Sequence, residues 1–435
     1  MAITITDQPT NFAKVGQKLM IVATSTEVAQ PNFRYVVRVT NTTTSEVLPD
    51  VIVPPNPQNR LMFDLSKVIE SNVLIKVYNE TTLDNYITNS LMTISTDWLN
   101  CIMQLSVKIY EAYDVAGVFT IDVASEEIID FSHAINAAYT IADGYKPDPN
   151  LEYSYTSTTS LLMGSRKPNT NYPSTLAGAT PSSQRVFIPV RKSELDWGTI
   201  AMIAQETGET VLTTTNDASL RMTLYESNGS PNSATYNAFI NLDINFLGVY
   251  PANLNAHGEL LRPEDYPNWR YYDIAMYDST NTTRKSALYT FYPVDDDCTF
   301  DNVRLAWWDD VVGGFDFFNF QRKNEITMEV ERKRVKPVVG TYDAATFSFN
   351  TFDAEIKEGM IDAVDYLDVT SGWIQEGEFE LLKHLVKSKL VYIVNDDATL
   401  TPVVMETNSF LVNKERAAKL KSISFRLRIA QQNIQ

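Results

Sequence analysis

Val303-Arg-Leu-Ala-Trp-Trp-Asp-Asp-Val-Val-Gly-Gly-Phe-Asp-Phe-Phe-Asn-Phe-Gln321 is the stretch in which aromatic side chains are densest and a turn signal is clearest. Residues 304–308 and 315–321 are rich in side chains that suit a pleated strand, and Gly313 and Gly314 allow the tight reversal between them. We therefore predict a β-hairpin. Because a buried aromatic ring removes roughly 150–250 Å² from water, we expect the rest of the chain to pack against this hairpin. An aromatic platform that stacks sugars or bases is the functional alternative.

Length and charge limit the classes of protein that the chain can belong to. Its 435 residues leave room for two or three domains, and 36 Lys and Arg against 54 Asp and Glu give a net charge of −18. An acidic surface repels phosphates, so we expect no sequence-specific nucleic acid binding. Cys101 and Cys298 are too few for a disulfide scaffold or a cysteine metal site.

The sequence shows no targeting or membrane signal. Residues 1–7 lack the basic and apolar regions of a signal peptide, and no apolar run approaches about eighteen residues. We expect a soluble protein that has no membrane span and is made in a cytoplasm.

Period-two alternation predicts strands along most of the chain. In the first part, Tyr35, Val37 and Val39 alternate with Arg34 and Arg38, which is typical of a half-buried strand. The fold class we predict is mainly β, with several β-sandwich-like domains, few short helices and long loops. The expected units are an N-terminal β-sandwich over 1–135, an extended arm or loop over 136–190, a central β-domain with the aromatic hairpin over 191–340, and a C-terminal β-domain with one helix over 341–435.

The segment 136–190 differs from its surroundings in composition. Between residues 144 and 183, Pro, Ser, Thr, Asn and Tyr dominate, and the only apolar triplet is Leu161-Leu-Met163. Such a segment cannot build its own core. Its tyrosines Tyr153, Tyr155 and Tyr172 favour a contact with a neighbouring subunit, since Tyr is enriched at interfaces. A flexible surface loop is the alternative.

A basic run follows another alternating strand near residue 330. Ile326, Met328 and Val330 alternate with polar residues, and a run containing Arg332, Lys333, Arg334 and Lys336 comes next. In so acidic a protein, this run suits an acidic face of a neighbouring copy. Alternatively it grips phosphates, or it is an exposed strand end that balances nearby acids. Further along, the pattern over 376–388 predicts a helix with Phe379, Leu382 and Val386 on its apolar face.

Motifs for catalysis and cofactor binding are missing. The three histidines form no His-Glu-x-x-His pair, and no phosphate-binding glycine loop or serine nucleophile elbow occurs. We therefore expect no enzyme activity, no catalytic residue and no cofactor. Acidic clusters such as Asp295-Asp-Asp297 suit solvated turns, although carboxylates on turns also bind Ca²⁺ and a carboxylate pair also serves glycosidases.

Several motifs resemble structural proteins of tailed phages that infect Bacteroidota, the crAss-like phages included. From the second half of the chain, the resemblance rests on Ala306-Trp-Trp-Asp, Gly313-Gly-Phe-Asp-Phe-Phe-Asn-Phe320, Thr370-Ser-Gly-Trp-Ile, Leu381-Leu-Lys-His-Leu-Val-Lys-Ser388, Val391-Tyr-Ile and Pro402-Val-Val. The opening is similar to N-terminal β-domains of the same group, in Ile3-Thr-Ile-Thr-Asp-Gln-Pro9, Pro31-Asn-Phe-Arg-Tyr-Val36 and Phe63-Asp-Leu-Ser-Lys-Val-Ile69. The Pro, Ser and Tyr-rich segment has no counterpart in this resemblance.

The resemblance implies a virion structural protein that assembles in rings and has no catalytic residues to carry over. The expected function is a structural subunit of the phage tail or of the head-to-tail connector, in a ring through which DNA passes. Expected partners are copies of itself and other tail, portal or connector proteins, and the expected location is the virion, after synthesis in the host bacterial cytoplasm. A receptor- or carbohydrate-binding tail module is the alternative function, and a depolymerase with a carboxylate pair is a third.

Overall fold

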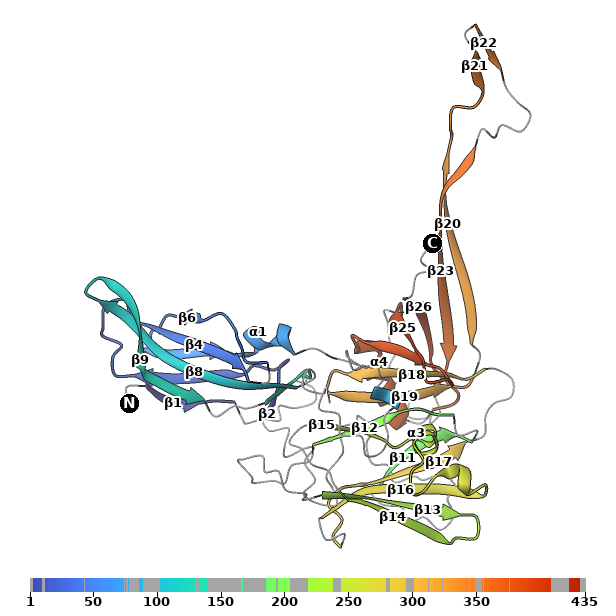
Figure 1. Cartoon of the computed structure of the whole chain (residues 1–435), viewed down its shortest axis with the longest axis horizontal. Coiled ribbons are helices and arrows are strands. Elements are labelled where there is room, and N and C mark those ends of the chain that lie inside the picture. The colour runs from blue at the N-terminus through green and yellow to red at the C-terminus, as the bar shows by residue number, and fades with distance from the viewer. Residues whose placement is uncertain are drawn as a thin grey trace.

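The computed structural model is mainly β, as predicted, with several sheets and few short helices. It describes residues 3–9, 12–42, 44–73, 75, 77, 86–88, 102–129, 133–138, 166, 185–192, 195–203, 218–237, 244–278, 282–294, 301–311, 313–322, 324–343, 345–348, 354, 356–374, 376–407 and 422–430. Figure 1 shows an N-terminal lobe on the left, a central sheet at the lower right, a C-terminal sheet above it, and a long ribbon that rises from the C-terminal sheet.

The N-terminal lobe is a sandwich of two sheets. Alternating side chains of both sheets, among them Ile21, Leu61, Val37 and Val107, are fully buried in one core, as the period-two pattern predicts. One sheet has the order β1-β3-β7, with β1 (Ile3–Asp7), β3 (Met20–Ser25) and β7 (Arg60–Asp64). The other has the order β2-β10-β8-β4-β5, with β2 (Phe12–Lys14), β10 (His133–Ile135), β8 (Ile102–Val115), β4 (Arg34–Asn41) and β5 (Glu46–Val47); β6 (Val51–Val53) pairs with β4, and β9 (Val118–Ile129) pairs with β8.

Among the described residues of the N-terminal half, three short helical segments occur. They are α1 (Ser66–Ile69), η1 (Glu70–Asn72) and η2 (Tyr86–Thr88). Ile69 and Ile87 are fully buried, so α1 and η2 each contribute an apolar side chain to a core.

The central sheet has five strands in the order β11-β17-β16-β13-β14. These are β11 (Arg185–Arg191), β17 (Leu288–Val294), β16 (Trp269–Asp278), β13 (Ala218–Glu226) and β14 (Pro231–Asn237); β11 and β17 are parallel, and the other neighbours are antiparallel. A second, two-stranded sheet of β12 (Thr199–Ile203) and β15 (Ile244–Gly248) shares its core, as do residues of α3 (Pro251–Ala256), which η6 (Pro263–Asp265) follows.

The C-terminal sheet has seven strands and includes the aromatic hairpin. Its order is β19-β18-β24-β25-β26-β23-β20, with β18 (Val303–Asp309), β19 (Gly314–Phe320), β20 (Glu325–Val335), β23 (Lys357–Thr370), β24 (Val391–Val394), β25 (Leu400–Met405) and β26 (Ser424–Ile429). Strands from both sides of residue 340 belong to this one sheet, so the domain boundary that we predicted at residue 340 does not separate two sheets. The predicted helix is α4 (Glu376–Lys387), and its residues Phe379 and Leu382 are buried against the sheet.

The predicted hairpin forms, and both of its faces are buried. Trp308, Phe315 and Phe317 on one face join the core of the central sheet. Trp307 and Phe318 on the other face join the C-terminal core, in which Phe320 also lies. All six aromatic side chains are at most 6% exposed, so a ligand-stacking platform is excluded and the hairpin is the wall shared by two cores.

The turn of the hairpin also touches the N-terminal sandwich. The buried Lys14 ammonium donates a 2.6 Å hydrogen bond to the carbonyl oxygen of Val311, and the Trp308 indole N–H donates a 3.0 Å bond to the carbonyl of Asn136. The expectation that the rest of the chain packs against this hairpin is confirmed, because the hairpin contacts all three lobes.

Candidate functional site

The most exposed element of the described chain is the ribbon of β20 and β23. All 11 residues of β20 are exposed, as are the first seven of β23. Eleven residues extend over roughly 36 Å at about 3.3 Å each. The ribbon rises away from the three lobes and leads to a second small hairpin, β21 (Thr341–Asp343) with β22 (Thr346–Ser348) (Figure 1). We call residues 325–370 the arm; this segment is distinct from the extended segment that the sequence predicts over 136–190.

The arm exposes apolar side chains that an ordinary surface strand does not carry. Ile326, Met328 and Val330 lie on one face of β20 and are 71%, 62% and 42% exposed. Ile361 and Met360 on β23 are 50% and 53% exposed. The alternation that marks buried strands elsewhere in this chain is therefore present on a strand that its own chain leaves uncovered.

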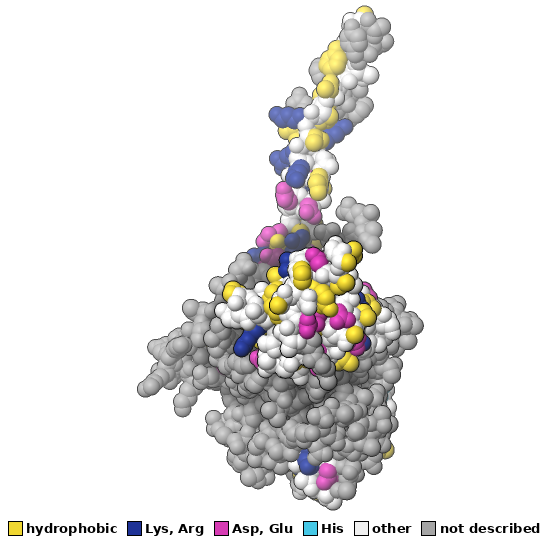
Figure 2. Space-filling model, turned by 90° about the vertical axis from the view of Figure 1, so that its left-hand side faces the viewer, with side chains coloured by type: hydrophobic (Ala, Val, Ile, Leu, Met, Phe, Trp, Pro, Cys, Tyr) yellow, Lys and Arg dark blue, Asp and Glu magenta, His cyan; other side chains and the backbone are white. Residues whose placement is uncertain are grey.

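The charges of the arm are separated along its length. The predicted interface residues Arg332, Lys333, Arg334 and Lys336 lie together in its outer half, where Lys357 pairs opposite Val335. The inner half carries Glu325, Glu329, Glu331, Asp362, Asp365 and Asp368. Figure 2 shows this order, with Asp and Glu near the base of the arm and Lys and Arg further out. The Arg332 guanidinium donates a 2.7 Å hydrogen bond to Glu358, so only part of the basic run is balanced locally.

The other predicted interface residues, Tyr153, Tyr155 and Tyr172, lie outside the described residues. From the segment 139–184, the structure describes only Arg166, whose guanidinium donates a 3.0 Å hydrogen bond to the carbonyl of Phe317. No sequence signal pointed to Arg166. Its bond links the Pro, Ser and Tyr-rich segment to the aromatic hairpin.

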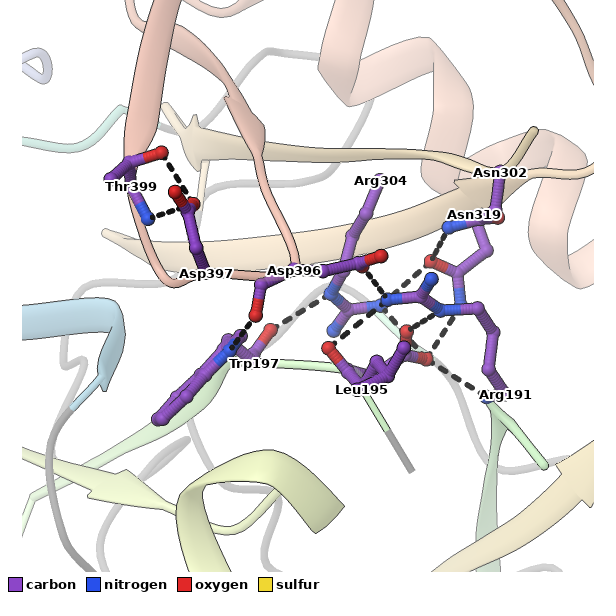
Figure 3. A network of polar contacts seen from close by, with 10 residues as sticks. Arg191, Leu195, Trp197, Asn302, Arg304, Asn319, Asp396, Asp397 and Thr399 are labelled. Carbon is purple, nitrogen blue, oxygen red and sulfur yellow. Dashed lines mark hydrogen bonds and ion pairs between the residues drawn. The ribbon is translucent and has the colours of Figure 1, made fainter. Parts of the chain in front are cut away.

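A buried polar network joins the central and C-terminal lobes (Figure 3). The Asp196 carboxylate is fully buried and accepts hydrogen bonds from the Arg191 side chain at 2.6 Å and from Asn319 at 2.6 Å. The Arg304 guanidinium lies 3.4 Å from the same carboxylate, and Arg191 also donates to Asp396 at 2.7 Å. Burial alone would raise the pKa of Asp196, but the charges of Arg304 and Arg191 outweigh it and hold that pKa below its usual value.

We call this network of Arg191, Asp196, Arg304, Asn319 and Asp396 the clamp, because it holds the two lobes together. The Arg304 guanidinium is enclosed by aromatic rings, with its central carbon 4.6 Å from the Tyr250 ring centre and 5.0 Å from that of Phe317. Its charge is matched by Asp196. The residues come from positions 191 to 396, so sequence spacing carried no signal for the network.

A cavity of about 260 Å³ lies beside the clamp. Aromatic side chains form much of its wall, and Trp373 is 67% exposed. Polar groups of Arg166, Asn319 and Glu378 also line it. Burial, and then the negative charge of Glu378, raises the pKa of Tyr292 in the same wall, so this hydroxyl stays protonated and available as a hydrogen-bond donor.

Within the described ranges, no group of three or more His, Cys, Asp or Glu side chains is arranged to hold a metal ion. In the same ranges, no helix combines the length and the apolar character that crossing a bilayer requires. No protein-family model matches the chain, and no curated protein matches it either.

Proposed function

We propose that this protein is a structural subunit of a tailed-phage virion and forms a ring of the tail or of the head-to-tail connector. The observation that carries the proposal is the arm. A ribbon that leaves Ile326 and Met328 more than 60% exposed keeps apolar area in water at a cost of about 25 cal/mol per Å². A second molecule that covers this ribbon recovers that free energy, so the arm suits a subunit of an assembly.

The rest of the architecture suits a wall element. Three β-lobes meet on one aromatic hairpin, and the buried clamp ties two of them together, which makes a stiff block. A net charge of −18 repels DNA, so a lumen lined by such subunits lets DNA pass without retaining it. Repeated copies in closed symmetry are the common way to build such a wall. No catalytic step belongs to this function.

The phage assignment rests on the sequence motifs that resemble structural proteins of Bacteroidota phages, at both ends of the chain. The proposed partners are therefore copies of the same chain, together with tail, portal or connector proteins. The proposed location is the virion, with synthesis in the host cytoplasm.

The test is the copy number of the chain in purified virions. Quantitative mass spectrometry of particles, calibrated on the major capsid protein, should give a multiple of six or twelve copies. Absence of the chain from particles that package DNA would reject the proposal.

A carbohydrate- or receptor-binding tail module is the second candidate, and the cavity beside the clamp favours it. The exposed Trp373 offers a stacking surface, and the Tyr292 hydroxyl and the Arg166 guanidinium line the same cavity and can bond sugar hydroxyls. A glycan array probed with the purified chain tests this candidate. Binding that Trp373→Ala abolishes would support it, and an array without signal would reject it.

A further inference from the structure

We infer that the arm of one copy docks on the β8–β9 hairpin of a second copy. This inference rests on the proposed ring assembly and names the two surfaces that meet in it. The β8–β9 hairpin ends in a turn at Ala116 and Gly117, which adopt φ 55° and 83°. It lies at the end of the N-terminal sandwich that is farthest from the other two lobes (Figure 1).

The β8–β9 hairpin is as unusual a surface as the arm. Its tip exposes Val115, Val118 and Phe119 at 53%, 64% and 39%, and Val123 on β9 is 71% exposed. Exposed apolar side chains therefore surround a turn that nothing in the described chain covers. Exposed apolar side chains gathered at one end of a hairpin are typical of an interaction site.

Acidic side chains accompany these apolar ones. Asp114, Asp122, Glu126 and Glu127 all lie on the two strands of the hairpin. Glu126 is engaged by Lys108 at 2.9 Å, which leaves a surplus of negative charge. Figure 2 views this end of the molecule and shows hydrophobic side chains interspersed with Asp and Glu.

The outer half of the arm has the complementary composition. It combines Lys333, Arg334 and Lys357 with exposed Val335 and Met360. Positive charge and apolar side chains on one surface thus meet negative charge and apolar side chains on the other. Such a match directs association and fixes its register more than it adds raw affinity.

The partner surface belongs to another molecule. Within one chain, the arm rises from the C-terminal sheet while the β8–β9 hairpin points away at the far end of the N-terminal lobe (Figure 1). The arm therefore cannot reach the β8–β9 hairpin of its own chain, but every copy carries both surfaces. Contact between the arm of one copy and the hairpin of the next is head-to-tail, and such contacts close into a ring when the rotation between copies allows it.

A second copy explains the arm better than DNA does. Of the residues that the structure describes in the arm, Arg332 is already paired with Glu358, and the inner half is acidic, so a phosphate backbone along the ribbon would meet repulsion. DNA also offers nothing apolar to cover Val335, Met360 and Ile361 of the outer half, whereas an apolar hairpin tip does.

Charge reversal on each surface tests the inference. Lys333→Glu with Arg334→Glu makes the arm acidic, and Asp114→Lys with Glu127→Lys makes the hairpin basic. Each double variant alone should self-associate at least about tenfold more weakly than the unmodified chain in sedimentation velocity at low salt, because like charges then face each other. An equimolar mixture of the two variants should associate to within about threefold of the unmodified chain. In the mixture, the acidic arm of one variant meets the basic hairpin of the other, and the basic arm of the second meets the acidic hairpin of the first.

Matched controls keep the outcome clear. Lys18→Glu with Lys67→Glu changes the net charge by the same amount as the arm reversal, at exposed sites of the N-terminal lobe, and should leave association unchanged. Circular dichroism melting of every variant should match that of the unmodified chain, because none of the altered residues is buried.

Four results would each overturn the inference. In the first, neither charge reversal weakens self-association. In the second, the equimolar mixture of the two variants does not regain the association of the unmodified chain. In the third, the arm reversal removes retention on a double-stranded DNA column but leaves self-association unchanged. An unmodified chain that stays monomeric at every concentration tested would overturn it too. The copy number in virions is measured independently, so the ring proposal survives or fails on its own data.

Discussion

The imidazole Nδ1 of His384 lies 2.8 Å from the Asp309 carboxylate, and this ion pair fastens helix α4 to the turn end of the aromatic hairpin. The Asp309 side chain is only 1% exposed, and that of His384 is 23% exposed. Asp316 and Lys387 are the other charged groups that act on the imidazole. The pair therefore joins two elements of the C-terminal lobe through a charge that depends on pH.

We predict that His384→Gln removes a pH-dependent part of the stability. Burial lowers the pKa of His384, but the bond to Asp309 and its charge outweigh burial and raise that pKa above its usual value. Burial likewise raises the pKa of Asp309, while His384 holds it below its usual value. The pair contributes fully between the unfolded-state pKa values of roughly 3.9 and 6.5, and its contribution is lost as pH rises through the raised His384 pKa or falls through the lowered Asp309 pKa.

Thermal melting between pH 5 and pH 9 measures this effect. The melting temperature of the unmodified chain should fall above pH 6.5 more steeply than that of His384→Gln, and the difference should shrink at alkaline pH. His257→Gln, at the end of α3, is the control for loss of a histidine elsewhere. Parallel curves for the unmodified chain and His384→Gln would contradict the prediction.

The two faces of the hairpin should be equally sensitive to truncation. Phe317→Ala opens the central core and Phe318→Ala opens the C-terminal core, since the two rings are 2% and 6% exposed on opposite faces. Each should cost roughly 3–5 kcal/mol in urea unfolding. Phe347→Ala, which is 48% exposed at the tip of the arm, should cost far less. Unchanged unfolding in both core variants would show that this hairpin is not the wall between two cores.

The sequence predicted the hairpin because its signals are local. Gly313 lies at a turn with φ 87°, and the aromatic runs flank it directly. The alternation at Val37 and Val39 likewise reports burial correctly. At Ile326 and Met328 the same alternation accompanies an exposed strand, because a period of two cannot distinguish a core within the chain from one supplied by a partner.

Long-range polar contacts left no trace in the sequence. Asp196 and Arg304 are separated by more than one hundred positions, and each residue type is ordinary in a solvated loop or strand. Only the folded chain shows that they share a buried site. The basic run at Arg332 was visible because its members are adjacent, although its position on a protruding ribbon was not.

Removing the centre of the clamp should be costly. Asp196→Ala leaves the buried guanidinium groups of Arg191 and Arg304 without their shared carboxylate, and breaking such a buried pair costs about 3–5 kcal/mol. Asp50→Ala is the matched control, because its pair with Arg38 has side chains 34% and 29% exposed and is worth at most about 1 kcal/mol. Urea unfolding of both variants measures the difference, and equal losses would remove the structural role of the clamp.

Gly313→Ala should separate the N-terminal sandwich from the hairpin turn. At φ 87°, an L side chain is strained by about 1–3 kcal/mol, and the new Cβ would also lie 2.6 Å from Ile135 Cδ1 of the sandwich. Gly117→Ala isolates the strain alone, since Gly117 has φ 83° and its Cβ would meet nothing within 4 Å. Hydrogen exchange should therefore be faster in Gly313→Ala, and not in Gly117→Ala, at two backbone N–H groups: that of Ala138, which bonds to the carbonyl of Asp310 in the turn, and that of Val15, which bonds to the carbonyl of Ile135. Equal exchange in the two variants would mean that the sandwich tolerates the added methyl group, and that Gly313 serves the turn and not the contact between lobes.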